Sequence, residues 1–362
     1  MARILMMIIL ILLMQSGCMD QKIVEELGFI HTIGYESIEE GEDIGKLKVT
    51  VSFPIAETLE QQTNTTVVDT PRESMLFLNQ QTDKDLVLGQ VRSILIGEKL
   101  AEKGVWDLID TFYRDPVLRP TVKLSIVKSS PQQMLSKDYP NFQMVDSVIE
   151  ELLTKEARLN SIPEMDIHKF AKDYLDDAID PIAPIILQTE DGIMSEGIGL
   201  FSDDQLRTSL PEIKARVFFL LTGEFKEGKL LIKISKEENV IFSFLKNKRS
   251  IKVGINNNQD IDVNLSIDLK GFLLEYQGKK DINNEKQMAE MEGDIQDYIE
   301  KEINEILEIM KEHQIDNLGI GKYIKRKMDY QTWKNLDWPK SIDRVNIHPT
   351  VTVTIIDTGL VK

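Results

Sequence analysis

Hydrophobic and polar residues alternate one by one in many parts of the chain, and this period of two is typical of a strand with one buried face. The clearest case is residues 46–53 (KLKVTVSF), which we predict as a half-buried strand in a hairpin with residues 27–35 (LGFIHTIGY). The polar, Thr-rich residues 57–71 are expected to form a loop or a mobile edge. Further extended segments are predicted at residues 91–96, 122–126, 181–188, 197–201, 229–234, 240–245, 251–255, 261–276 and 350–357.

Apolar residues spaced three and four apart predict helices elsewhere in the chain. The longest, residues 285–313, carries a stripe of Met and Ile residues that fits either a coiled-coil seam or, in a strand-rich domain, a face packed on the core. We favour the core-facing stripe. The other expected helices cover residues 98–114, 144–153, 167–178 and 213–221, with a short one around Tyr323.

The order of these elements is strands, then helices, then a final strand, which predicts an α+β fold. We expect several domains whose mixed or antiparallel sheets pack against helices, without a βαβ repeat. The polar segment 188–192 (QTEDG) ends in glycine, and the character of the chain changes after it. The predicted division is therefore an α+β domain at residues 18–190 and a second α+β domain at residues 191–362.

The N-terminus carries the strongest functional signal. Arg3 is followed by an apolar run, residues 4–14, that is too short to cross a hydrocarbon core of about 30 Å and fits a signal peptide over residues 1–17. The following Ser-Gly-Cys resembles a bacterial lipobox, in which the cysteine thiol receives a diacylglyceryl group. We therefore predict Cys18 as a lipid attachment site. The alternative is a plain signal peptide, or a weak membrane anchor, with an incidental cysteine.

The net charge of −17 disfavours nucleic acid as a partner, because phosphates repel an acidic chain. Anionic lipid headgroups repel it as well, so membrane attachment has to come from a hydrophobic anchor. A single cysteine also excludes an internal disulfide and a thiolate metal cluster.

No motif in the chain predicts an active site. The four histidines have no metal-ligand spacing, both Gly-Ile-Gly segments lack the third glycine of a nucleotide-binding loop, and residues 256–262 lack the glycine and glutamate of a calcium loop. Paired acids on an exposed helix face are usually solvated rather than catalytic. We therefore predict no enzyme activity, no cofactor and no metal. The residues considered and set aside are His31, His168, His313, His348, Gly197–Gly199, Gly319–Gly321, Asn256, Asn258, Asp260, Asp262, Asp176, Asp177 and Ser195.

Three ordered blocks resemble the Ger(x)C family, the lipoprotein C subunits of nutrient germinant receptors in endospore-forming bacteria. The first is Cys18-Met19-Asp20 with IVEELGFIHTIGYE, and the second runs from ILIGEKLAEKGVWDLIDTFYRDPVLRP to SSPQQML. The third comprises the acidic helix, DNLGIGKYIKRK, Trp333, Trp338 and VTVTIIDTGLV. Together the blocks span nearly the whole chain after the signal peptide.

The resemblance implies a lipoprotein on the outer face of the spore inner membrane, in a complex with two integral-membrane subunits, A and B, that senses small nutrients. It carries over one site residue, Cys18, and no catalytic residue. We expect Arg114, Asp115 and Arg119 to pair locally, and Trp333 and Trp338 to anchor a small core. Direct nutrient binding by this chain is doubtful, since no basic and acidic cluster stands out against an apolar lining. The alternative function is an extracytoplasmic solute-binding lipoprotein of a transporter.

Overall fold

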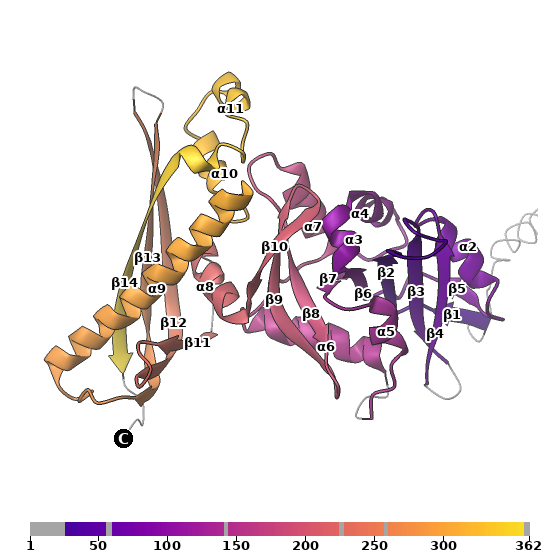
Figure 1. Cartoon of the computed structure of the whole chain (residues 1–362), viewed down its shortest axis with the longest axis horizontal. Helices are drawn as coiled ribbons and strands as arrows, with labels where there is room; N and C mark the ends of the chain where they lie inside the picture. The colour runs from indigo at the N-terminus through magenta and orange to yellow at the C-terminus, as the bar shows by residue number, and fades with distance from the viewer. Residues whose placement is uncertain (1–25, 56–59, 141–143, 224–227, 257–259, 358–362) are drawn as a thin grey trace, which may run out of the picture.

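The computed structural model describes residues 26–55, 60–140, 144–223, 228–256 and 260–357. Figure 1 shows an elongated molecule, with a large sheet and its helices in one half and a tall sheet crossed by one long helix in the other. None of the helices in these described ranges is long and apolar enough to cross a bilayer. The predicted signal peptide and Cys18 lie outside the described residues.

An eight-stranded sheet forms the larger half, in the order β10-β9-β8-β7-β6-β2-β3-β4. The strands are β2 (Thr32–Ser37), β3 (Leu47–Pro54), β4 (Gln61–Val68), β6 (Ser93–Gly97), β7 (Lys123–Val127), β8 (Ile182–Gln188), β9 (Ile193–Ser202) and β10 (Gln205–Pro211). A short parallel pair, β1 (Leu27–Phe29) and β5 (Asp85–Val87), flanks the sheet. The expected domain boundary near residue 190 falls at the turn between β8 and β9, which pair with each other in this sheet.

The centre of this sheet is parallel, because β2, β6, β7 and β8 all run in one direction. Helices α3 (Glu98–Lys103) and α4 (Trp106–Tyr113) connect β6 to β7, and α5 (Pro131–Ser136), α6 (Val145–Arg158) and α7 (Ile167–Leu175) connect β7 to β8. The α+β class with mixed sheets is confirmed, but the expected absence of a βαβ repeat is wrong. Strand β6 is buried at all five positions, so it shows none of the alternation that marks a strand in the sequence.

Two local predictions fail for identifiable reasons. The expected helix 98–114 is divided at Gly104, whose φ of +128° is not helical. Strand β3 is buried on both faces, because α5 and α6 cover the side that carries Thr50 and Ser52, and Ser52 donates a hydrogen bond to Asp146 of α6 at 2.8 Å. The Thr-rich segment expected as a loop or edge contains β4, the edge strand of the sheet, followed by α2 (Glu73–Asn79).

The second half is a four-stranded sheet in the order β11-β12-β13-β14. Its strands are β11 (Gly228–Lys233), β12 (Asn239–Ile255), β13 (Ile261–Gln277) and β14 (Val345–Asp357), and α8 (Glu212–Thr222) leads into it. Helix α9 (Glu285–His313) runs across one face (Figure 1) and buries Met291, Ile295, Ile299, Ile303, Ile306 and Met310 completely. The core-facing stripe is therefore confirmed. Strand β14 runs parallel to β13, because α9, α10 (Ile320–Lys325) and α11 (Tyr330–Leu336) carry the chain back across the sheet.

Candidate functional site

Asp180, just before β8, joins three distant segments of the chain at the junction of the two halves. Its carboxylate accepts the backbone N–H of Asp316 at 2.7 Å and that of Asp203 at 3.0 Å. The backbone N–H of Asp180 donates in turn to the carbonyl oxygen of Asp316 at 2.9 Å. Since Asp180 is 4% exposed and Asp316 is fully buried, these bonds form a dry link between the halves.

Asp316 organises the chain that follows α9. One carboxylate oxygen accepts the N–H of Ile320 at 3.0 Å, and the other accepts the N–H of Gly321 at 2.6 Å and the indole N–H of Trp338 at 3.1 Å. The first turn of α10 and the segment after α11 are thereby held on one side chain. Gly319 precedes α10 with a φ of +67°, so the first glycine of this Gly-Ile-Gly segment is a turn residue, as predicted, while Ile320 and Gly321 begin the helix.

Asn317 completes the link with its side-chain amide. Its Nδ2 donates to the carbonyl oxygens of Pro181 at 2.7 Å and Phe201 at 3.0 Å, and the residue is 4% exposed. Asp316 and Asn317 thus bond backbone groups beside β8 and in β9, two neighbouring strands of the larger sheet. A buried backbone carbonyl without a partner would cost about 1–3 kcal/mol, so these bonds give the interface a defined geometry.

Burial shifts the pKa of both carboxyl groups upward. Desolvation raises the pKa of Asp180 to about 7 and that of Asp316 to about 6, against the opposing effect of the N–H donors around them. The negative charge of Asp316 raises the pKa of Asp180 further. The junction therefore contains two carboxyl groups that change charge close to neutral pH.

An ionic rim surrounds this buried link. Partial burial opposes ionisation of Asp177, but hydrogen bonds from Lys325, Lys334 and the indole of Trp333 hold the pKa of its carboxyl well below its usual range. Asp176 forms an ion pair with a lysine of α10 at 3.4 Å. The prediction that this acidic pair is solvent-accessible rather than catalytic agrees with the structure, because the side chains of Asp176 and Asp177 stay 32% and 38% exposed while they pair with lysines of α10 and α11.

Other residues singled out in the sequence have local roles. Arg114 donates to Asp110 at 2.7 Å, and Arg119 donates to the side chain of Gln90 at 3.2 Å. Trp333 and Trp338 are 3% and 9% exposed with ring centroids 6.1 Å apart, so their role in a core is confirmed, but this core is the large one of the second half rather than a small separate one. Local pairing is confirmed for Arg114, whereas the partner of Arg119 is 29 residues away in the sequence.

The remaining candidates are not brought together. His31 lies before β2, His168 in α7, His313 at the end of α9 and His348 in β14. Across the described residues, no group of three or more His, Cys, Asp or Glu side chains is placed to hold a metal ion. Asn256 and Asp260 bond each other at the β12–β13 hairpin, as a polar turn would.

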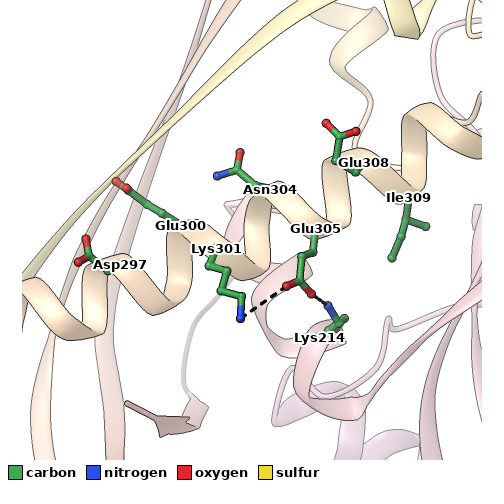
Figure 2. Close-up of a pocket in the computed structure, with 8 residues that line it drawn as sticks. All are labelled: Lys214, Asp297, Glu300, Lys301, Asn304, Glu305, Glu308 and Ile309. Carbon is green, nitrogen blue, oxygen red and sulfur yellow. Dashed lines mark hydrogen bonds and ion pairs between the residues drawn. The ribbon is translucent and has the colours of Figure 1, made fainter. Parts of the chain in front are cut away.

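A shallow groove runs along the outer side of α9 (Figure 2). Lys214 of α8 forms ion pairs there with Glu302, at 3.3 Å, and with Glu305, which also pairs with Lys301 at 3.9 Å. Glu300 accepts the backbone N–H of Val351 at 2.9 Å and so ties α9 to β14. These contacts hold α8, α9 and β14 together, and the groove keeps an excess of negative charge, since four carboxylates and two lysines line it.

Sequence reasoning missed Asp180, Asp316 and Asn317. Buried and exposed aspartates look alike in a sequence, and all three residues come from segments that read as turns. The one available signal was the Gly-Ile-Gly directly after Asp316-Asn317, since glycines permit the close backbone approach that a buried carboxylate needs. A Cβ at Gly321, for example, would lie 2.9 Å from the carbonyl oxygen of Ala178.

Comparison with known proteins shows which family this chain belongs to. Residues 20–188 match the spore germination protein N-terminal domain, and residues 196–359 match the spore germination B3/GerAC-like C-terminal domain. Both matches occur in the order of the family, so the chain belongs to the GerAC-like, or Ger(x)C, family of spore germination proteins. The two matched regions meet between β8 and β9.

Particular relatives extend over nearly the whole chain. Spore germination protein GerQC of Bacillus cereus is 24% identical over 347 residues, which cover 96% of each chain. The putative spore germination protein YfkR of Bacillus subtilis (strain 168) is 21% identical over 377 residues, covering 97% of this chain and 95% of the relative. The crystal structure of the GerBC protein shares the fold, with a TM-score of 0.60, 16% identity and coverage of 90% of this chain and 97% of that one.

Proposed function

We propose that this chain is the lipid-anchored C subunit of a spore nutrient germinant receptor, acting with integral-membrane A and B subunits on the outer face of the spore inner membrane. The observation that carries the proposal is the ordered match of both germination domains along almost the entire chain. The full-length similarity to proteins named for germination supports it. Its role is assembly and signalling rather than catalysis.

The junction supports a non-catalytic role. The oxygens of Asp180 and Asp316 accept backbone and indole N–H groups and are buried, so a substrate has no access to them. Rigid coupling of two domains is what a subunit needs if a contact made by one domain is to alter the position of the other. The lipobox ending at Cys18 supplies the hydrophobic anchor that the acidic body requires.

The test is purification of a tagged copy from detergent-solubilised spore membranes of the bacterium that encodes it. We expect two polytopic membrane proteins of the receptor to co-purify, and we expect spores without this chain to lose their response to at least one nutrient. Recovery of transporter subunits instead would favour the solute-binding alternative. Recovery of the tagged chain alone, with an unchanged nutrient response in the deletion strain, would refute the proposal.

A further inference from the structure

The N-terminal half contains a hollow of about 380 Å³ that shares no lining residue with the junction link. It lies between β2, the start of α2 and the C-terminal end of α4. Its floor is apolar and includes the edge-to-face ring pair of Tyr35 and Phe112, whose centroids are 5.8 Å apart. Ile33, Met75 and Leu88 complete this floor. The volume is at the lower end of the 300–1,000 Å³ or so that is typical of small-molecule sites.

Charged groups from two separate segments stand at the rim of the hollow. Arg72, at the start of α2, has no ion pair or hydrogen bond within the described part of the chain. Arg114, at the end of α4, uses its Nε for Asp110, and its two terminal nitrogens bond no other described residue. Asp115, which also lines the hollow, accepts the backbone N–H of Val117 through one oxygen at 2.9 Å, and its second oxygen bonds no other described residue.

We infer that this hollow is a binding site for a small amphipathic carboxylate. The apolar part of the ligand lies on the Tyr35–Phe112 floor, and its carboxylate lies between the guanidinium groups of Arg72 and Arg114. A planar guanidinium binds a carboxylate through two parallel N–H···O bonds, which favours this anion over a spherical one. If the ligand also carries an ammonium group, the free oxygen of Asp115 accepts it.

The charged groups at the rim of the hollow argue against two simpler ligands, a purely apolar molecule and an amine. A purely apolar ligand would leave the guanidinium of Arg72 and the terminal nitrogens of Arg114 without an acceptor. An amine would meet Arg72 and Arg114 at the rim, where Asp115 is the one carboxylate that lines the hollow and Asp110 is already paired with Arg114. The site goes beyond the proposed function, because anchoring and assembly need no ligand in this subunit. It also runs against the sequence-based expectation that this chain does not bind a nutrient directly. The charged and apolar residues that line the hollow come together only in the folded chain, so the sequence alone could not reveal them.

The test uses three probes that share one aromatic ring and differ in charge: 3-phenylpropionate, L-phenylalanine and 2-phenylethylamine. Among the residues that the structure describes, the buried core runs from Ile30 to Val353, so a chain of residues 19–362 keeps all of it. Titration of this chain by ligand-observed NMR is expected to show 3-phenylpropionate binding with a dissociation constant of about 1 mM or tighter, and 2-phenylethylamine binding at least about tenfold more weakly. L-Phenylalanine should bind at least as well as 3-phenylpropionate, because it adds an ammonium group for Asp115.

Arg72→Ala and Arg114→Ala should each weaken 3-phenylpropionate binding by about tenfold, which is the loss of about 1.4 kcal/mol. The matched control is Arg119→Ala, because Arg119 is an exposed arginine of the same loop that does not line the hollow. Leu88→Trp, which fills the floor, should abolish binding of all three probes while circular dichroism confirms the fold. The inference is overturned if the carboxylates do not bind, if the amine binds equally well, or if the arginine variants bind like Arg119→Ala.

Discussion

The carboxylate of Asp180 accepts the backbone N–H of Asp316 at 2.7 Å, across a separation of 136 residues in the sequence. Asp316 in turn holds the first turn of α10 and the indole of Trp338. The two halves of the molecule are therefore joined by specific, buried hydrogen bonds. Perturbing either carboxylate should affect the stability of the whole molecule.

Asp180→Ala is expected to destabilise the protein by about 1–3 kcal/mol, because it leaves the buried N–H of Asp316 without this acceptor, while the part-buried N–H of Asp203 can turn to water. The measurement is chemical denaturation of the chain of residues 19–362. Asp191→Ala, at an exposed turn position, is the control and should change the free energy of unfolding by less than about 0.5 kcal/mol. Equal stability of the two variants would show that the Asp180 link is dispensable.

The protein should become more stable as the pH falls from 8 to 5. The folded-state pKa values of Asp180 and Asp316, about 7 and about 6, lie above the ordinary value of 3.8, so the folded state binds protons that the unfolded state does not. The resulting stabilisation is present at low pH and is lost as the pH rises through 6 to 7. Thermal unfolding across this range measures it.

Asp180→Asn, which removes one titrating group, should flatten the pH profile above pH 5. Below pH 4 the trend should reverse, because Asp177 has a depressed pKa and its ion pairs are lost when it is protonated. A melting temperature that rises steadily from pH 5 to pH 8 would contradict this account.

Two glycine-to-alanine substitutions should change the stability of the protein in opposite directions. Gly321→Ala should destabilise the protein by about 1–3 kcal/mol, because the new methyl group would overlap the indole nitrogen of Trp338 and press on the carbonyl oxygen of Ala178. Gly293→Ala, inside α9 with no atom within 4 Å of the added carbon, should stabilise it by about 0.5–1 kcal/mol. Urea denaturation of both variants side by side tests the packing at the junction directly.

Cys18→Ser should release the protein from the membrane without unfolding it, because the acidic body offers no second electrostatic attachment. The measurement is the fraction retained on membranes after detergent-free washing, in cells that lack the proposed partner subunits. The unsubstituted chain is the control. Full retention of Cys18→Ser under these conditions would mean that another part of the chain binds the bilayer.

The sequence was most informative where one face of an element is buried and the other is exposed. The stripe of α9 and the alternation of β13 predicted both elements within a residue or so of their bounds. The sequence was least informative where an element is buried on both faces, or where the buried residues are polar. Strand β6 shows no alternation, Thr50 and Ser52 are polar yet buried, and the link through Asp180 depends on contacts between residues that are far apart in the chain.

The parallel pairing of β13 with β14 has a consequence for how the chain folds. Residues 278–344 separate the two strands, so β14 can take its place only after α9, α10 and α11 have been synthesised and have crossed the sheet. Loop closure over so long a segment makes such pairing slow compared with the β12–β13 hairpin. Until the last strand arrives, β13 therefore presents an open edge, and this edge is a point at which an incompletely folded chain is exposed to aggregation.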